Sequence, residues 1–342
     1  MIKFIMPFLT SFLITTSLII AGMYLGKKIK WSDRVSPRHI HRTGALRIGG
    51  VVMVVAFNLT ILLNNDLVIA PGLYGVMAAS ILLMLVGVWD DIREIYWKTQ
   101  FFFQVAIAIL VFIMGVRIYY ITNPLTGGIL RLDYGIGAIF SIILVITWII
   151  LMINSMNWLD GIDGLSGGIT FIGAITIFFL SLKPEVNQPP MAILAMIVAG
   201  TALAFLVFNF NPSRILAGTS GSMFMGFSLA VLAIFAGTKI ATSILVMSIP
   251  VIDFLWVIGE RIRNKKYIFK PDKMHLHYKL LDLGWSQKRT ALYFYAVTIL
   301  ISVVALNTRF IGKTITLLAT AAIMAFSLAV ISKKIKKTKT SQ

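Results

Sequence analysis

Long apolar runs constrain this chain more than any other feature of its sequence. Eleven segments of about 15–23 residues are nearly free of charge, which is close to the length that a helix needs to cross the hydrocarbon core of a bilayer. Lipid offers no partner to backbone N–H and C=O groups, so a segment of this kind spans the membrane as a helix. The predicted spans are 4–26, 46–63, 67–89, 100–115, 136–153, 168–182, 190–208, 222–236, 240–258, 290–306 and 309–331.

Composition agrees with a membrane protein. Of the 342 residues, 58% are hydrophobic and only 13% are charged, and the mean hydropathy is +0.90. This balance is not that of a soluble globular protein. The net charge of +18 does not indicate nucleic acid as a partner, because the basic residues lie in short loops between apolar runs. The sequence therefore predicts one all-α integral membrane domain over residues 1–342.

The loops also predict an orientation. With the N-terminus outside, most of the 31 Lys and Arg residues fall on the inner side, chiefly in 27–47, 259–289 and the tail 332–342. The excess of Lys and Arg in cytoplasmic loops then favours an N-out, C-in topology with an odd number of spans. In this topology all four histidines and most carboxylates lie on the inner face. The span centres hold almost no charge, which disfavours an ion-coupled transporter.

The stretch 154–168 reads NSMNWLDGIDGLSGG and begins at the end of an apolar run. Its polar residues Asn154, Asn157, Asp160 and Asp163 recur at every third position, so three of the four can share one face of an ideal helix. The glycines that follow predict that the helix gives way to a loop that brings Asp163 round. Asp residues in a Gly-rich connector are an alternative. We interpret the stretch as part of a metal-diphosphate site.

Two adjacent carboxylates, Asp90 and Asp91, end the third apolar run. Neighbours on a helix point about 100° apart, so one face of partners cannot neutralise both. A divalent cation or a proton-transfer role explains the pair better than solvation at a helix end. Mg²⁺ prefers a few carboxylates together with phosphate oxygens of a substrate.

Three further segments supply hydrogen-bond donors on the same face. Residues 36–50 are basic and rich in groups suited to phosphate, although a loop that reaches lipid head groups is an equal alternative. Pro212 is expected to end a helix near an Asn pair. An H-x-H pair lies in a Lys-rich loop, where phosphate or sugar contact is favoured over zinc because no cysteine is present. The candidate substrate-binding residues are Arg38, His41, Asn154, Asn157, Asn209, Asn211, His275 and His277.

These motifs, in this order, resemble those of the polyprenyl-phosphate N-acetylhexosamine-1-phosphate transferases (glycosyltransferase family 4) over about residues 33–290. The short H-x-H loop is more similar to the branch that transfers GlcNAc-1-phosphate to undecaprenyl phosphate. The resemblance implies ten or eleven helices in the inner (plasma) membrane and an active site on the cytoplasmic face. It also implies transfer of a sugar-1-phosphate from a UDP-sugar to a polyprenyl phosphate, release of UMP and a requirement for Mg²⁺, with Mn²⁺ as a substitute. The expected partners are these two substrates, the membrane and, as an option, a second copy of the chain.

The resemblance also implies roles for individual residues. Asp90 and Asp91 are the catalytic pair, with Asp90 the base that deprotonates the lipid phosphate. Asn157, Asp160 and Asp163 match the segment N-x-x-D-G-x-D-G. The metal ligands expected on this basis are Asp91, Asp160 and Asp163.

Three positions depart from the family pattern. Thr219 stands where the family has an Asp that binds Mg²⁺, Tyr278 where His is usual, and Gln100 where Lys usually follows the paired acids. A Thr hydroxyl is a poorer ligand than a carboxylate, so metal binding must weaken or rely on the remaining Asp residues. The sequence therefore leaves an alternative open, in which the chain binds polyprenyl phosphate or UDP-sugar as a regulator or assembly partner with little activity.

Overall fold

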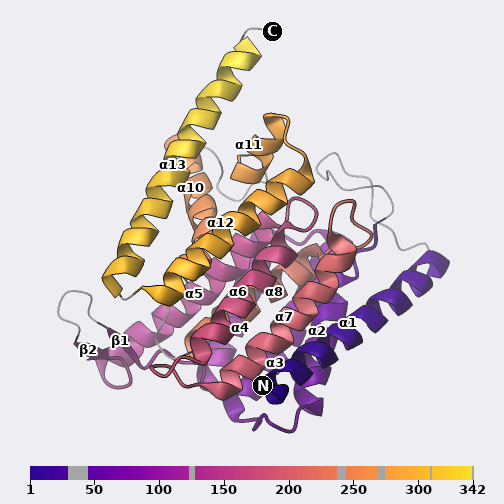
Figure 1. Ribbon diagram of the computed structural model, residues 1–342, viewed down its shortest axis with the longest axis vertical. Helices are drawn as coiled ribbons and strands as arrows, with labels where there is room; N and C mark the ends of the chain where they lie inside the picture. The colour runs from indigo at the N-terminus through magenta and orange to yellow at the C-terminus, as the bar shows by residue number, and fades with distance from the viewer. Residues whose placement is uncertain are drawn as a thin grey trace.

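The computed structural model describes residues 1–29, 45–122, 128–236, 244–265, 267, 274–308 and 310–340. Helices dominate this part of the chain, and the one sheet found there is a two-stranded hairpin (Figure 1). The helices are α1 (Ile2–Ile29), α2 (Gly49–Leu63), α3 (Pro71–Arg93), α4 (Trp97–Ile113), α5 (Ile136–Leu159), α6 (Leu165–Ser181), α7 (Pro189–Asn209), α8 (Gly218–Phe235), α10 (Ser248–Arg263), α11 (Leu276–Asp282), α12 (Gln287–Asn307) and α13 (Phe310–Thr340). The strands β1 (Tyr120–Thr122) and β2 (Ile129–Arg131) pair antiparallel, with Tyr120 opposite Arg131.

Helix α8 is the centre of the bundle. It contacts α2, α3, α5, α6 and α7, and nearly all its residues from Ser220 to Ile234 are buried. Helices at the edge are different, since α13 exposes large apolar side chains such as Leu318 and Phe326 along its length. An apolar surface of this extent needs a lipid environment. The expected all-α membrane fold is therefore confirmed in its main feature.

Most of the helices coincide with predicted spans. Seven helices, α1, α3, α5, α7, α8, α12 and α13, are long and apolar enough to cross a membrane, and α2, α4 and α6 are shorter apolar helices. The predicted span 240–258 corresponds in its second half to the amphipathic helix α10, which continues to Arg263. The count of eleven spans and the N-out orientation stay predictions.

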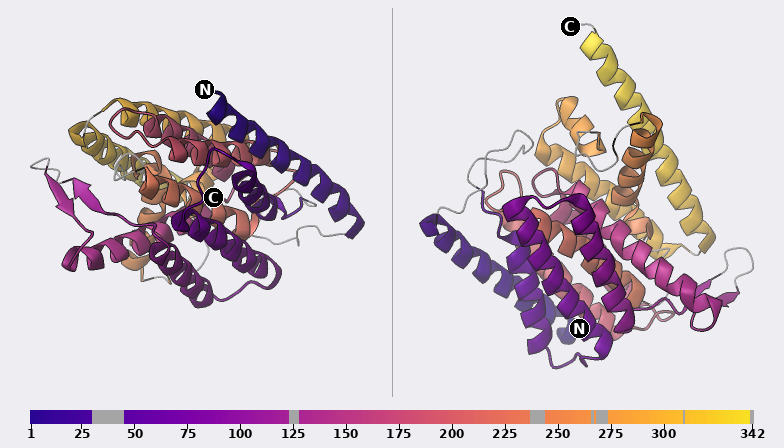
Figure 2. Two further views of the ribbon diagram at one scale, coloured as in Figure 1. Left: turned by 90° about the horizontal axis from the view of Figure 1, so that it is seen from below. Right: turned by 180° about the vertical axis from the view of Figure 1, so that it is seen from behind.

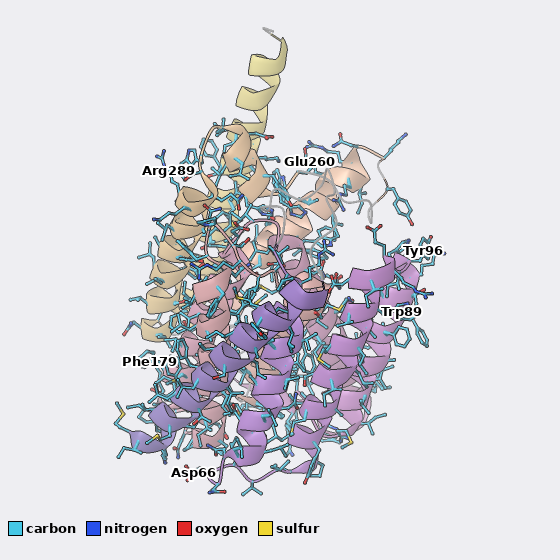
Figure 3. The ribbon with its side chains drawn as sticks, turned by 90° about the vertical axis from the view of Figure 1, so that its right-hand side faces the viewer. Asp66, Trp89, Tyr96, Phe179, Glu260 and Arg289 are labelled. Carbon is cyan, nitrogen blue, oxygen red and sulfur yellow. The ribbon has the colours of Figure 1, made fainter. Side chains whose placement is uncertain are left out.

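The two ends of the bundle carry different residues. Asp66 lies at one end, whereas Trp89, Tyr96, Glu260 and Arg289 lie toward the other (Figure 3). The β1–β2 hairpin projects from the side of the bundle, and the C-terminal part of α13 extends beyond it (Figures 1 and 2). The polar motifs of the sequence are thereby gathered mainly at the end that holds Trp89 and Glu260.

Candidate active site

The two adjacent carboxylates occupy the last turn of α3. The C-terminal end of a helix carries partial negative charge, so Asp90 and Asp91 are unfavourable there unless other groups donate to them. The chain supplies those donors. The backbone N–H of Ile95, just past the helix end, donates to Oδ1 of Asp90 at 3.0 Å. The remaining donors come from distant parts of the sequence.

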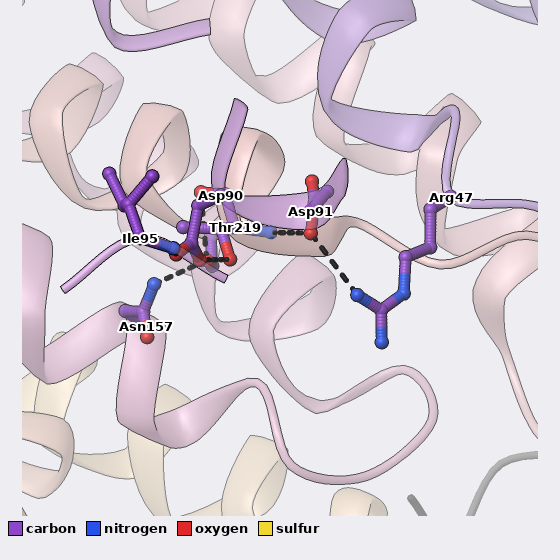
Figure 4. A network of polar contacts seen from close by, with 7 residues as sticks. Arg47, Asp90, Asp91, Ile95, Asn157 and Thr219 are labelled. Carbon is purple, nitrogen blue, oxygen red and sulfur yellow. Dashed lines mark hydrogen bonds and ion pairs between the residues drawn. The ribbon is translucent and has the colours of Figure 1, made fainter. Parts of the chain in front are cut away.

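The N-terminus of α8 faces the end of α3, and Thr219 joins them (Figure 4). The Thr219 hydroxyl donates to Oδ2 of Asp90 at 2.6 Å, and its backbone N–H donates to Oδ1 of Asp91 at 3.0 Å. The first N–H groups of a helix have no partner within it and carry partial positive charge. The two carboxylates at the C-terminal end of α3 are thus stabilised by the N-terminus of α8.

Close backbone contact makes this arrangement possible. A Cβ added at Gly50 in α2 would lie 2.2 Å from the backbone N of Gly221, and one at Gly87 in α3 would lie 2.3 Å from Cα of Ser220. Real Cβ atoms do not approach backbone so closely, so both positions require glycine. Helices α2 and α3 therefore meet the first turn of α8 directly.

Arg47 is placed by a short backbone ladder. Leu46 forms a parallel bridge with Ile215, and the N–H groups of Gly49 and Gly50 donate to the carbonyls of Leu216 and Ala217 at 3.0 Å each. The guanidinium of Arg47 then lies 3.4 Å from Oδ1 of Asp91 (Figure 4). The Asp91 side chain is buried, while that of Arg47 is 24% exposed, so Arg47 can also reach an anion from outside the protein.

The predicted Asn residues of α5 have different surroundings. Asn157 donates to Oγ of Ser222 at 3.1 Å, and this hydroxyl donates to the Thr219 carbonyl, so Asn157 belongs to the carboxylate site. Asn154, one turn earlier, donates to Gln104 of α4 at 2.7 Å and to the Ile150 carbonyl. Its amide ties α4 to α5, and its role toward a substrate stays a prediction.

The stretch after α5 folds as the glycines predict. Helix α5 ends at Leu159, and Gly164 has a φ of +81°, which admits the chain into α6. Asp160 accepts a hydrogen bond from the Ser166 hydroxyl at 2.5 Å. Asp163 turns inward and is buried.

The Asn pair at the end of α7 binds Asp163 and the neighbouring Gly164. Oδ2 of Asp163 accepts from the Asn211 side chain at 2.9 Å and from the Ser213 backbone at 3.1 Å. Asn209 accepts from the Gly164 backbone at 2.9 Å and donates to the Ile215 carbonyl at 2.8 Å. These contacts join the 160–164 loop to the segment that leads into α8. A ligand role for Asp163 and a substrate role for Asn209 and Asn211 stay predictions.

Comparison with known proteins identifies the family of the chain. The pattern of the family described as glycosyl transferase family 4 matches residues 73–237. The decaprenyl-phosphate N-acetylglucosaminephosphotransferase of Mycobacterium leprae is 32% identical over 289 residues, which cover 75% of this chain and 72% of that protein. The chain belongs to glycosyl transferase family 4.

Other family-4 relatives resemble the chain over most of its length. A Bacillus subtilis protein named probable undecaprenyl-phosphate N-acetylglucosaminyl 1-phosphate transferase is 28% identical over 320 residues, covering 90% of this chain and 85% of its own. The phospho-N-acetylmuramoyl-pentapeptide-transferase of Bacillus pumilus is 29% identical over 322 residues, covering 88% and 95%. The family resemblance expected from the motifs is confirmed.

In this family-4 protein, the segment that carries His275 and His277 packs against residues 158–161. His275 binds Oδ2 of Asp253 in α10 through Nδ1 at 2.8 Å, and the Leu276 N–H donates to the other carboxylate oxygen at 2.8 Å. The ring of His275 lies edge-on to Trp158 with centroids 5.4 Å apart. Asp253 therefore holds the start of α11 in place.

His277 lies deeper than its neighbour. Its ring stacks on His275 at a centroid distance of 5.6 Å and is fully buried, and neither ring nitrogen has a hydrogen-bond partner among the described residues. Burial lowers the pKa of His277 to about 3, with a smaller contribution from the charge of His275. The ring is therefore neutral at pH 7, and a role of His275 and His277 toward a substrate stays a prediction.

Tyr278 stands where the family has His. Its side chain packs against Gly161, in the same segment 158–161. A Cβ on Gly161 would lie 2.4 Å from Nε2 of His277 and 2.5 Å from the Tyr278 hydroxyl, so glycine allows this approach. Burial raises the pKa of Tyr278 to about 12, and the charge of Asp160 acts in the same direction. The phenol therefore stays protonated and remains a donor at neutral pH.

The donor set at the carboxylate site fits a divalent cation that arrives with phosphate. Oδ2 of Asp91 is buried and has no hydrogen-bond partner among the described residues, which leaves one hard oxygen ligand available. In the same part of the chain, no group of three or more His, Asp and Glu side chains is close enough to hold a metal on its own. Mg²⁺ is commonly bound by one or two carboxylates together with substrate phosphates. The expected set of Asp91, Asp160 and Asp163 stays a prediction.

Two predicted residues, Arg38 and His41, lie outside the described residues. The sequence did not single out the roles of Gln104, Ser222 and Asp253. Gln104 in α4 and Ser222 in α8 are polar side chains inside otherwise apolar helices. A polar side chain at such a position generally indicates a hydrogen-bond partner nearby. The partner itself could not be read from the sequence.

Proposed function

We propose that this family-4 protein transfers an N-acetylhexosamine-1-phosphate, with GlcNAc-1-phosphate as the first candidate, from a UDP-sugar to a polyprenyl phosphate and releases UMP. The carboxylate pair of α3, held between the start of α8 and Arg47, carries the proposal. The names of the mycobacterial and Bacillus relatives support the polyprenyl phosphate acceptor and the sugar phosphate. Such a product would begin a cell-envelope polysaccharide at the cytoplasmic face of the inner membrane.

The residues suit the chemistry of phosphoryl transfer. An oxygen of the lipid phosphate attacks the β-phosphorus of the UDP-sugar and forms a new P–O bond. The bond between this phosphorus and the bridging oxygen breaks, and UMP leaves with the electron pair. Arg47 and the N-terminus of α8 can offset the charge of the phosphates, and Asp90 can accept a proton from the lipid phosphate. Bound Mg²⁺ would spread the charge that develops on the phosphate oxygens, with Asp91 as its protein ligand.

A second candidate is a protein that binds polyprenyl phosphate or UDP-sugar with little turnover. The hydrogen bond from Thr219 to Asp90 favours it, because this donor occupies the oxygen that a base would use. A neutral hydroxyl also stands at the position where the family resemblance implies a carboxylate ligand.

One assay separates the two candidates. Purified protein is given undecaprenyl phosphate, Mg²⁺ and a panel of UDP-sugars, and UMP is measured. We expect UMP with a UDP-N-acetylhexosamine, and its loss in Asp90→Asn but not in Asp133→Asn, an exposed Asp beside the hairpin. Retained lipid-phosphate binding without UMP release from any sugar would favour the binding protein.

A further inference from the structure

An apolar cavity of about 400 Å³ lies under α13, between this helix and α10, α11 and α12 (Figure 1). Leu300 of α12 and Ile323 of α13 line it, and each exposes 65% of its surface. The cavity therefore opens on the outside of the bundle, toward the hydrocarbon of a bilayer. Its described walls contain no residue of α3 or α8, so it is separate from the carboxylate site.

The length of this cavity matches one leaflet of a membrane. Its wall on α12 extends from Tyr293 to Val304. At the rise of an α-helix this stretch is about 16 Å long. The hydrocarbon core of a bilayer is about 30 Å thick, so one leaflet is about 15 Å deep. Because the acyl chains of phospholipids set this depth, the cavity has the length of one acyl chain.

Aromatic and cationic side chains gather at the Tyr293 end of the cavity. Trp285 lines it there, and its ring meets that of Tyr293 edge to face with centroids 5.6 Å apart. The Arg289 guanidinium lies 4.3 Å from the centroid of Trp285. Arg289 is exposed and lies toward the end of the bundle that holds Glu260 (Figure 3). Trp and Tyr favour the membrane–water interface, so this end is placed at the depth of the lipid head groups.

The charge at this end is positive. None of the ion pairs among the described residues involves Arg289. Asp282 follows the cavity residue Leu280 by two positions on α11, and a turn of about 100° per residue directs it to the other side of that helix. Lys288 lies over the ring of Phe210 in α7, at 6.0 Å. Arg289 is therefore the cation beside the cavity, and a guanidinium binds phosphate through paired hydrogen bonds.

We propose that this cavity binds one acyl chain of an anionic phospholipid and that Arg289 binds the phosphate of its head group. The ligand is a diacyl lipid rather than a polyprenyl phosphate, because the cavity is one leaflet deep and a polyprenyl chain is much longer. Its head group carries net negative charge, because a zwitterionic head group would bring an ammonium beside Arg289, where no carboxylate is placed to receive it.

The bound chain would support the segment that carries the histidines. Leu276 and Leu280 of α11 form part of the cavity wall, and His277 and Tyr278 between them approach Gly161. An unfilled cavity leaves its lining without contacts on one side. Hydrocarbon in the cavity therefore packs α11 against α12 and α13 and holds these two side chains in place from behind.

The test measures lipid binding and does not depend on turnover. The full chain is purified in detergent, stripped of lipid and titrated with phosphatidylglycerol or with phosphatidylcholine of the same acyl chains, and bound lipid is counted by native mass spectrometry. Ala319→Trp fills the cavity, whereas Ala322→Trp makes the same change at an exposed position of α13 outside the cavity wall. Arg289→Gln and Lys288→Gln each remove one exposed positive charge.

We expect one phosphatidylglycerol to bind more tightly than phosphatidylcholine and to raise the melting temperature. Arg289→Gln should weaken phosphatidylglycerol binding about tenfold, as the loss of a hydrogen bond to a charged group predicts. Ala319→Trp should abolish the binding and the rise in melting temperature. Lys288→Gln and Ala322→Trp should retain both.

Three results would overturn the inference. They are equal binding of the two phospholipids, equal losses in Arg289→Gln and Lys288→Gln, and full binding to Ala319→Trp. Displacement of phosphatidylglycerol by an equal concentration of undecaprenyl phosphate would also reject a diacyl lipid as the occupant. Ser327→Leu, a smaller change in the same cavity wall, replaces Ala319→Trp if the melting curve shows that this variant does not fold.

Discussion

The hydroxyl of Thr219 donates a 2.6 Å hydrogen bond to Oδ2 of Asp90 and so links the start of α8 to the end of α3. In the same residue, the backbone N–H donates to Asp91. A single residue at the start of α8 thus donates one hydrogen bond to each carboxylate. The residue at position 219 therefore decides whether the site holds two carboxylates or three, and substitution of Thr219 tests this directly.

Replacing Thr219 by Asp adds a third carboxylate beside Asp90 and Asp91. Without a cation the like charges repel, so we expect a lower melting temperature that Mg²⁺ restores. We also expect Mg²⁺ to bind at least tenfold more tightly, about 1.4 kcal/mol, and UMP release to rise. Isothermal titration with Mg²⁺ and the UMP assay measure these effects. Thr219→Asn, which adds no charge, is the control, and lower activity of Thr219→Asp at saturating Mg²⁺ would contradict the assignment of this position.

Arg47 is expected to bind phosphate as well as Asp91. A hydrogen bond to a charged group contributes about 1.5–3 kcal/mol, so Arg47→Gln should lower the affinity for polyprenyl phosphate or kcat/KM about 10- to 100-fold. Arg93→Gln removes the same charge from an exposed position at the end of α3, the helix that carries Asp91. Binding of a radiolabelled prenyl phosphate to both variants checks the expectation. Equal losses in the two would indicate that only net charge matters.

His277 predicts how stability depends on pH. Its pKa is about 3 in the folded protein, below the ordinary 6.5 of an unfolded chain. Between these values the unfolded chain binds a proton that the folded ring does not. The contribution of this ring is therefore fully present above pH 6.5 and is lost as pH falls toward 3. At pH 5 the loss is about 2 kcal/mol.

The variant His277→Phe removes this titration but keeps an aromatic ring in the stack. We expect its melting temperature to fall less than that of the unmodified protein between pH 7 and pH 5. Tyr278→Phe serves as the control, because the Tyr278 phenol, with a pKa of about 12, does not titrate in this range. Parallel pH profiles for His277→Phe and the unmodified protein would show that the ring is not buried as the structure has it.

Gly87→Ala tests the contact between α3 and α8. The added Cβ would overlap the backbone at Ser220, so the two helices must separate. Overpacking of this kind costs about 1–3 kcal/mol, and we expect a lower melting temperature together with lost UMP release. Gly259→Ala in α10 is the matched control, since its Cβ meets no atom within 4 Å. It should be neutral or slightly stabilising. Equal behaviour of the two variants would exclude a tight α3–α8 contact.

The helices were predictable because apolar runs of membrane length have few alternative structures. The run at 190–208 became α7, Pro189–Asn209, almost without change. Boundaries failed where tertiary contacts decide them. Helix α2 begins at Gly49 rather than 46, since Leu46 pairs with Ile215 more than a hundred residues away. The β1–β2 hairpin and α11 are too short for apolar periodicity to predict them, since β1 has 3 residues and α11 has 7.

The site was predictable in its residue types but not in its pairings. Carboxylates and amides near helix ends indicated a polar site on one face of the membrane. Nothing local in the sequence shows that Asp163 accepts from Asn211, or that the Asp90–Asp91 pair meets the start of α8. These partners lie 48 to 129 residues apart, and only packing of the bundle brings them together.

The glycine contacts at Gly50 and Gly87 have a mechanical consequence. Backbone touches backbone where α2 and α3 meet α8, so no flexible side chain lies between them to absorb a change in helix tilt. Helices adapt to a thinner or thicker bilayer by tilting. A change in membrane thickness that tilts α2 or α3 is therefore expected to alter the spacing between Thr219 and the two carboxylates.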